Sequence, residues 1–76
     1  MRVARAVVLS EAERDALGRW SRGRSTPARL VLRAQIILSA ATGARNGEIA
    51  RKVGTSCPTV VLWRGRFVQE RLAGIE

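Results

Sequence analysis

The sequence lacks most of the side chains from which catalytic and metal sites are built. It has no histidine and one cysteine among its 76 residues. Without histidine there is no imidazole base and no Cys–His or Ser–His pair. A single cysteine can form neither an internal disulfide nor a zinc cage. The sequence therefore predicts no catalytic residue, no metal site and no cofactor, and an enzyme is the least expected class of protein.

Long apolar segments are missing too. No stretch approaches the roughly 20 continuous apolar residues that a membrane-spanning helix needs. The apolar run at 6–9 follows Arg2 and Arg5 but is shorter than the core of a signal peptide, about 7–15 residues. We therefore expect no membrane partner, and a location in the reducing cytoplasm.

What the sequence has in excess is positive charge. Lysine and arginine total 14 against 6 acidic residues, which gives a net charge of +8, and 46% of the residues are hydrophobic, as in a chain that folds. All the cations but Lys52 are arginines, whose planar guanidinium suits bidentate contacts to phosphate and guanine. A polyanionic partner is one interpretation. Solvated helix faces in an arginine-rich composition are the other, and composition alone does not separate the two.

Cap residues and helical periodicity divide the chain into four helices. Its length fits one domain, residues 1–76, with a short extended arm at 1–9. The helices are expected at about 10–21, 26–42, 46–53 and 56–72, and their predicted first residues or caps are Ser10, Thr26, Asn46 and Ser56. Ser10 and Glu13 have the spacing of a capping box. No pair of strands is expected, so the fold class is all-α.

Residues 49–63 have the spacing of a helix-turn-helix, in which two helices cross steeply at a short turn. Ala50 supplies a small side chain where the second helix crosses the first. Gly54 follows four positions later and can take a positive φ in the turn. Val60, six positions further on, is a β-branched residue that faces the first helix. The alternative is two amphipathic helices joined by an ordinary glycine turn.

The phase of the last helix separates a buried side from an outward side. Val60, Trp63 and Phe67 recur at helical spacing and mark the buried side. In a helix-turn-helix, the N-terminal part of the second helix lies on the base edges of the DNA major groove. The candidate DNA-binding residues of this segment are Ser56, Cys57, Pro58, Thr59, Val61, Leu62, Arg64, Gly65, Arg66 and Gln69. Secondary candidates for phosphate contacts are Arg51, Lys52 and Arg71.

Four of these residues carry specific expectations. Arg64 and Arg66 are the first choices for phosphate or guanine contacts, with Arg64 nearer the groove wall and Arg66 nearer the groove floor. The alternative for each arginine is a solvated surface charge. Val61 and Leu62 either contact thymine methyl groups or pack against the C-terminal tail or another domain.

The chain resembles the N-terminal DNA-binding region of bacterial insertion-sequence transposases of the six-thirty type, in the mariner-like superfamily. The matching stretches are V-V-L-S-E-A-E-R at 7–14, T-P-A-R-L-V-L-R-A-Q-I-I-L at 26–38, A-T-G at 41–43, N-G-E-I-A-R-K-V-G-T-S-C-P-T-V-V-L-W-R-G-R-F at 46–67 and R-L-A-G-I at 71–75. The resemblance implies a compact homeodomain-like bundle that recognises transposon ends. In that family a ribonuclease-H-like domain with three metal-binding carboxylates follows, and the sequence contains none of it. The resemblance therefore implies end recognition without strand cleavage.

Three functions remain for comparison with the structure. The leading one is sequence-specific binding of double-stranded DNA at terminal inverted repeats by the DNA-binding part of a transposase, on the bacterial nucleoid. The second is a free-standing helix-turn-helix transcriptional regulator, which normally needs a dimer interface. The third is an interaction module in which Val61 and Leu62 bury against another protein. A homo-oligomer and a covalent continuation into a catalytic domain both stay open.

Overall fold

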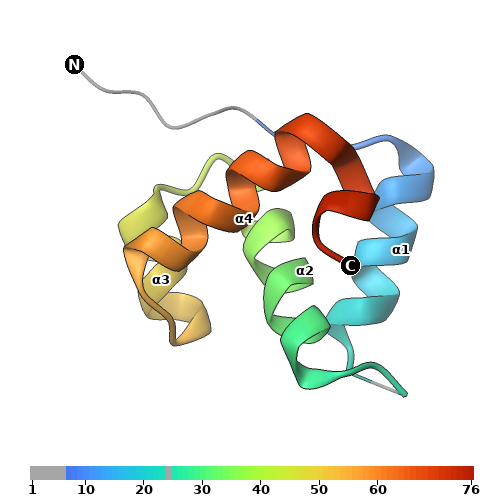
Figure 1. Ribbon diagram of the computed structural model, residues 1–76, viewed down its shortest axis with the longest axis horizontal. Coiled ribbons are helices and arrows are strands. Elements are labelled where there is room, and N and C mark those ends of the chain that lie inside the picture. Colours follow the sequence, from blue (N-terminus) through green and yellow to red (C-terminus); the bar gives the residue numbers. More distant parts are fainter. Residues whose placement is uncertain (1–6, 24) are drawn as a thin grey trace.

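Four α-helices and one 3₁₀ turn make up the computed structural model, which describes residues 7–23 and 25–76. In chain order they are α1 (Glu11–Ser21), α2 (Ala28–Ala41), α3 (Asn46–Val53), α4 (Cys57–Glu70) and the 3₁₀ turn η1 (Arg71–Gly74), as Figure 1 shows. None of the described residues belongs to a strand, so the all-α prediction is confirmed. No helix in this part of the chain is long and apolar enough to cross a membrane.

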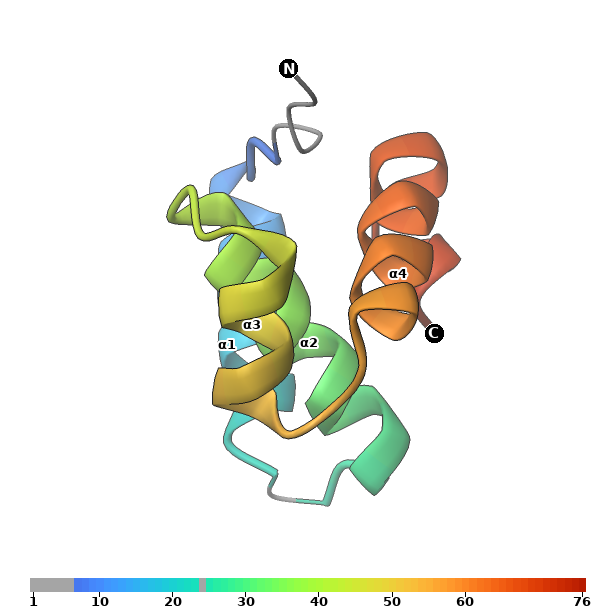
Figure 2. The same cartoon turned by 90° about the vertical axis from the view of Figure 1, so that its left-hand side faces the viewer.

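The central element is α2, which contacts α1, α3 and α4 (Figures 1 and 2). Its buried residues Ile36 and Ile37 are neighbours in sequence and therefore point about 100° apart around the helix. A helix with buried side chains in such different directions must be covered on more than one side. The surrounding elements supply the rest of the core, namely Leu17, Ile49, Val60, Phe67 and Ile75, all of them fully buried.

Helix α1 begins as predicted. The Ser10 hydroxyl accepts a hydrogen bond from the Glu13 amide at 3.1 Å, and the Glu13 carboxylate accepts one from the Ser10 amide at 3.0 Å. This reciprocal pair is the capping box. Helix α2 begins two residues later than the predicted 26, because Pro27 has an extended ψ of 142° and takes the N-cap position itself.

Asn46 does not cap α3. Arg45 occupies the N-cap position with extended backbone, and its amide donates to the Glu48 carboxylate at 2.9 Å. The side-chain oxygen of Asn46 instead accepts a hydrogen bond from Arg64 at 2.8 Å. The predicted cap is wrong because a partner 18 residues away takes up the Asn46 side chain.

Both ends of the described chain pack on the bundle. Of the arm predicted at 1–9, Val7–Leu9 are non-helical with Val7 buried, and residues 1–6 lie outside the described part. At the other end α4 stops at Glu70, earlier than the predicted 72, and η1 turns the chain back (Figure 1). This return buries Ile75, whose carbonyl accepts a hydrogen bond from Arg33 at 3.1 Å.

Candidate nucleic-acid interface

The turn between α3 and α4 has the predicted geometry. Gly54 has φ 79° and ψ 40°, in the left-handed region where a side chain is strained. Its amide and that of Thr55 both donate to the Ala50 carbonyl at 2.9 Å. Ala50 and Val60 are both buried where the two helices meet. The pair is a helix-turn-helix, and Gly54 is the residue that permits its sharp turn.

The first turn of α4 is exposed and capped. The Ser56 hydroxyl accepts a hydrogen bond from the Thr59 amide at 3.4 Å and lies 2.9 Å from the Thr59 hydroxyl. Cys57 and Pro58 are exposed, and Pro58 stands in the first turn, where a missing amide donor costs the helix nothing. The positive end of the helix dipole is therefore open to an anion such as a DNA phosphate.

One side of α4 is buried and the opposite side is free. Val60 and Phe67 are fully buried, as predicted, whereas Trp63, the third residue expected on this side, is only half-buried. The exposed residues of the helix are Cys57, Pro58, Val61, Leu62, Arg66, Gln69 and Glu70. Gly65 lies among them and is half-buried. In Figure 2, α4 stands along one side of the molecule, with the other helices to one side of it only.

Val61 and Leu62 lie on this free side. They are 54% and 47% exposed, among the few large hydrophobic residues in the described chain with so much accessible surface. The C-terminal segment does not cover them, because it packs back where Ile75 is buried. Of the interpretations given above, packing against the tail is therefore wrong. Contact with DNA and contact with another molecule both remain.

Arg64 does not belong to the exposed set. The residue is 5% exposed, and its Nη1 donates to the Ala44 carbonyl at 3.1 Å and to the Asn46 Oδ1 at 2.8 Å. Burial also lowers the pKa of this guanidinium. Arg64 therefore joins α4 to the start of α3, and the expectation that it lies on the groove wall is corrected. Its helical phase places it beside Val60 and Phe67, and hydrogen-bond acceptors on α3 and the loop before it make that burial tolerable.

Arg66 keeps an outward position beside an aromatic ring. It is exposed, and its guanidinium carbon lies 5.9 Å from the centre of the Trp63 ring. A second guanidinium, that of Arg33 on α2, lies 3.9 Å from the same ring centre. Such cation–π contacts favour a fixed position for each guanidinium. Arg33 was absent from the predicted site, because no local pattern relates it to Trp63, thirty positions along the chain.

Arg71 is also engaged inside the domain. Its Nε and Nη2 donate to the two carboxylate oxygens of Glu13 at 2.8 and 2.6 Å, and its guanidinium lies 4.6 Å from the centre of the Phe67 ring. The hydrogen bonds from Arg71, then that from the Ser10 amide, lower the pKa of Glu13 from 4.5 to about 2, and the pairing raises the pKa of Arg71. Arg71 therefore ties the end of α4 to the start of α1. The Arg71 side chain remains 45% exposed, so its secondary role as a phosphate contact stays a prediction.

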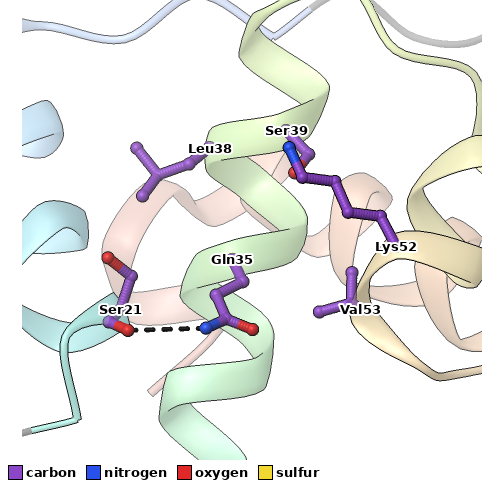
Figure 3. Close-up of a pocket in the computed structure, with 6 residues that line it drawn as sticks. All are labelled: Ser21, Gln35, Leu38, Ser39, Lys52 and Val53. Atoms are coloured by element: carbon purple, nitrogen blue, oxygen red, sulfur yellow. Dashed lines mark hydrogen bonds between the residues drawn. The ribbon is translucent and has the colours of Figure 1, made fainter.

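The two cations predicted on α3 lie in different surroundings. Both Arg51 and Lys52 are exposed. Lys52 extends from α3 toward Ser39 of α2, in a groove whose lining residues come from α1, α2 and α3, with none from α4 (Figure 3). In this groove the Gln35 side-chain amide donates to the Ser21 carbonyl at 3.4 Å. Lys52 thus lines a different surface from the outward side of α4.

Nothing in the described residues assembles a cluster of metal-binding side chains. Among residues 7–23 and 25–76, no group of three or more histidine, cysteine, aspartate or glutamate residues is placed to hold a metal ion. Cys57 is a free, exposed cysteine at the start of α4. The features that stand out are the turn and the free side of the helix after it.

Comparison with known families agrees with this geometry. Residues 27–75 match the model of the homeodomain-like domain, more than half of the chain. The chain belongs to the homeodomain-like family. The matched segment of this homeodomain-like domain contains α2, α3, α4 and η1, whereas α1 precedes it. Comparisons with curated proteins and with solved structures gave no significant match. A homeodomain-like helix-turn-helix is a DNA-binding fold, and the predicted fold and class of partner are supported at that level.

Proposed function

We propose that this homeodomain-like domain binds double-stranded DNA sequence-specifically, and that it recognises the terminal inverted repeats of a transposable element as the DNA-binding part of a transposase. The observation that carries the proposal is the free side of α4. It follows a left-handed glycine turn and is held in place from behind by the buried Val60 and Phe67. This is the position of the recognition helix in helix-turn-helix proteins.

The charge of the recognition helix supports a nucleic-acid partner. The exposed charged residues of α4 are Arg66 and, at its last position, Glu70, so the part of the helix before Glu70 presents a cation and no carboxylate. The N-terminal end of the helix adds a partial positive charge, and Arg51 is exposed on the preceding helix. A duplex carries one negative charge for about every 1.7 Å of its axis, so such a surface gains affinity from released counterions.

The transposase assignment is supported by the extent of the resemblance. It spans stretches in every described helix and in η1, including T-P-A-R-L at 26–30 and the whole of the helix-turn-helix. Homeodomain-like domains of this family also occur in transposase DNA-binding regions. In this proposal the domain locates a DNA end and contributes no catalytic group to cleavage.

The test is a selection of bound sequences from random duplexes, followed by comparison with the ends of the DNA element that encodes the protein. We expect one enriched sequence that also occurs in inverted orientation at the two ends. Enrichment of a two-fold symmetric site near promoters would favour the transcriptional regulator. Failure to enrich any sequence, with no binding to duplex DNA at low salt, would overturn DNA recognition altogether.

Salt dependence gives a second test with matched variants. Since Arg64 and Arg71 are engaged internally, we expect only about two or three neutralised phosphates and a slope of log affinity against log salt near −2 to −3. Arg51→Ala is expected to reduce the magnitude of the slope by about one unit. Arg14→Ala, which removes an exposed arginine from α1, is the control and is expected to leave the slope unchanged.

A further inference from the structure

Building on the proposed DNA binding, we propose that α4 selects its site chiefly through thymine methyl groups, which Val61 and Leu62 contact in the major groove. The preferred sequence then contains two or more T·A pairs in adjacent positions opposite the first two turns of the helix. Val61 and Leu62 are the residues that determine this specificity.

The first two turns of α4 offer few groups that can hydrogen-bond to a base edge. The exposed positions there are Cys57, Pro58, Val61 and Leu62, none of which carries an amide, a carboxylate or a guanidinium. Direct readout of adenine and guanine uses such bidentate groups, most often asparagine, glutamine or arginine. The hydroxyls of Ser56 and Thr59 lie 2.9 Å apart and bond to each other. Bidentate hydrogen-bonding readout is therefore left to Arg66 and Gln69, further along the helix.

The major groove presents one apolar group, the C5 methyl of thymine. An aliphatic side chain packed against that methyl removes apolar surface of both groups from water. One buried carbon of this kind is worth about a fourfold change in affinity. Gly65, between Leu62 and Gln69 on the same side, adds no side chain that would hold the helix away from the groove.

The surroundings of these two residues favour DNA over a protein partner. The apolar part of the surface has only two large side chains, at 54% and 47% exposure, whereas stable protein interfaces bury about 800 Å² on each partner. Arg66 lies on the same exposed side of the helix, and the carboxylate of α4, that of Glu70, comes eight positions after Leu62. A small apolar strip beside arginine complements a thymine-containing groove between two phosphate backbones.

Uracil substitution tests this inference, because deoxyuridine lacks only the methyl group of thymidine. Each thymidine of the selected duplex is replaced in turn, and affinity is measured by fluorescence anisotropy. We expect at least two neighbouring replacements to weaken binding about fourfold each, and uridines outside the site to have no effect. Where a thymidine of the site is replaced by cytidine, 5-methylcytidine at the same position is expected to bind more tightly than cytidine, because it restores the methyl group.

Protein variants link the effect to the two side chains. Val61→Ala and Leu62→Ala are each expected to lose the fourfold difference at one of the two replaced thymidines, and the double variant at both. Val8→Ala, which shortens a 76% exposed valine outside α4, is expected to keep both differences. Circular dichroism checks that each variant folds. Specific binding that ignores uracil would overturn the thymine inference and leave the proposed function intact, whereas absence of any sequence preference would overturn both. If Val61→Ala or Leu62→Ala abolished self-association in sedimentation experiments but left the response to uracil unchanged, the exposed side of α4 would be a contact with a second copy of the chain.

Discussion

Replacement of Arg64 separates the internal role that the structure gives this residue from the DNA contact that its position in the sequence suggests. The side chain is almost fully buried and donates hydrogen bonds to Ala44 and Asn46. Arg64→Ala removes both bonds and leaves two acceptors at the start of α3 without this donor. Hydrogen bonds from a charged group are worth about 1.5–3 kcal/mol each, and the acceptors regain part of this from water.

We therefore expect Arg64→Ala to lower the free energy of unfolding by about 3 kcal/mol. A domain of this size has about 4–11 kcal/mol in total, so the change is a large share of its stability. The corresponding fall in melting temperature is about 12–24 °C. Thermal melts followed by circular dichroism, together with urea titrations, measure it directly.

Two matched variants make the result decisive. Gln69→Ala shortens an exposed side chain on the same helix and is expected to change the free energy of unfolding by less than about 0.5 kcal/mol. Arg64→Lys keeps the charge but loses the fork that reaches both acceptors, and is expected to lie between Arg64→Ala and the parent. If Arg64→Ala melted like the parent while its DNA affinity fell, Arg64 would be a DNA contact and the buried geometry would be wrong.

Three further perturbations follow from the contacts. Since the pKa of Glu13 is lowered to about 2, its ion pair with Arg71 stabilises the fold above pH 4.5 and is lost as the pH falls through about 2. The free energy of unfolding should fall by about 1 kcal/mol over that interval after solvent screening, with a matching drop in melting temperature, and Glu13→Gln should flatten the profile. A Cβ at Gly74 would lie 2.5 Å from the Arg66 carbonyl oxygen, so Gly74→Ala is expected to lower the free energy of unfolding by about 1–3 kcal/mol in urea titrations. Gly47→Ala is the control: its Cβ would meet only the Cys57 Sγ at 4.0 Å, and the change should be neutral or slightly stabilising. Phe67→Ala should cost about 3–5 kcal/mol in the same assay, and Trp63→Ala clearly less, because Phe67 is fully buried and Trp63 is half-exposed beneath Arg33.

Local chemistry explains why much of the fold could be predicted. Ser10 and Ser56 act as caps within their own first turns, and Gly54 ends α3 through its own φ. The spacing from Ala50 to Val60 specifies the crossing of α3 and α4, since both residues are needed at one contact. Each of these signals spans fewer than a dozen positions, which is the range over which a sequence pattern describes geometry directly.

Contacts between distant positions account for what the sequence could not predict. Asn46 has the chemistry of an N-cap, but Arg64 recruits its side chain and Arg45 takes the cap position. The predicted continuation of the last helix to 72 is wrong because the chain turns at Arg71, which Glu13 holds from the far end of the sequence. The local pattern around Asn46 gives no sign of its contact with Arg64, and the pattern around Arg71 gives none of its contact with Glu13.

The arginines show why charge alone overstates the DNA-binding surface. Arg64, Arg66 and Arg71 look alike in sequence, yet one joins α4 to α3, one stays exposed beside Trp63 and one pairs with Glu13. Arg64 and Arg71 still support the proposed recognition, because Arg64 holds the middle of α4 against the start of α3 and Arg71 holds its C-terminal end against α1. Their loss would weaken binding to every sequence by loosening the helix that presents Val61 and Leu62. A fall in affinity therefore identifies a DNA contact in this domain only when the free energy of unfolding of the same variant is unchanged.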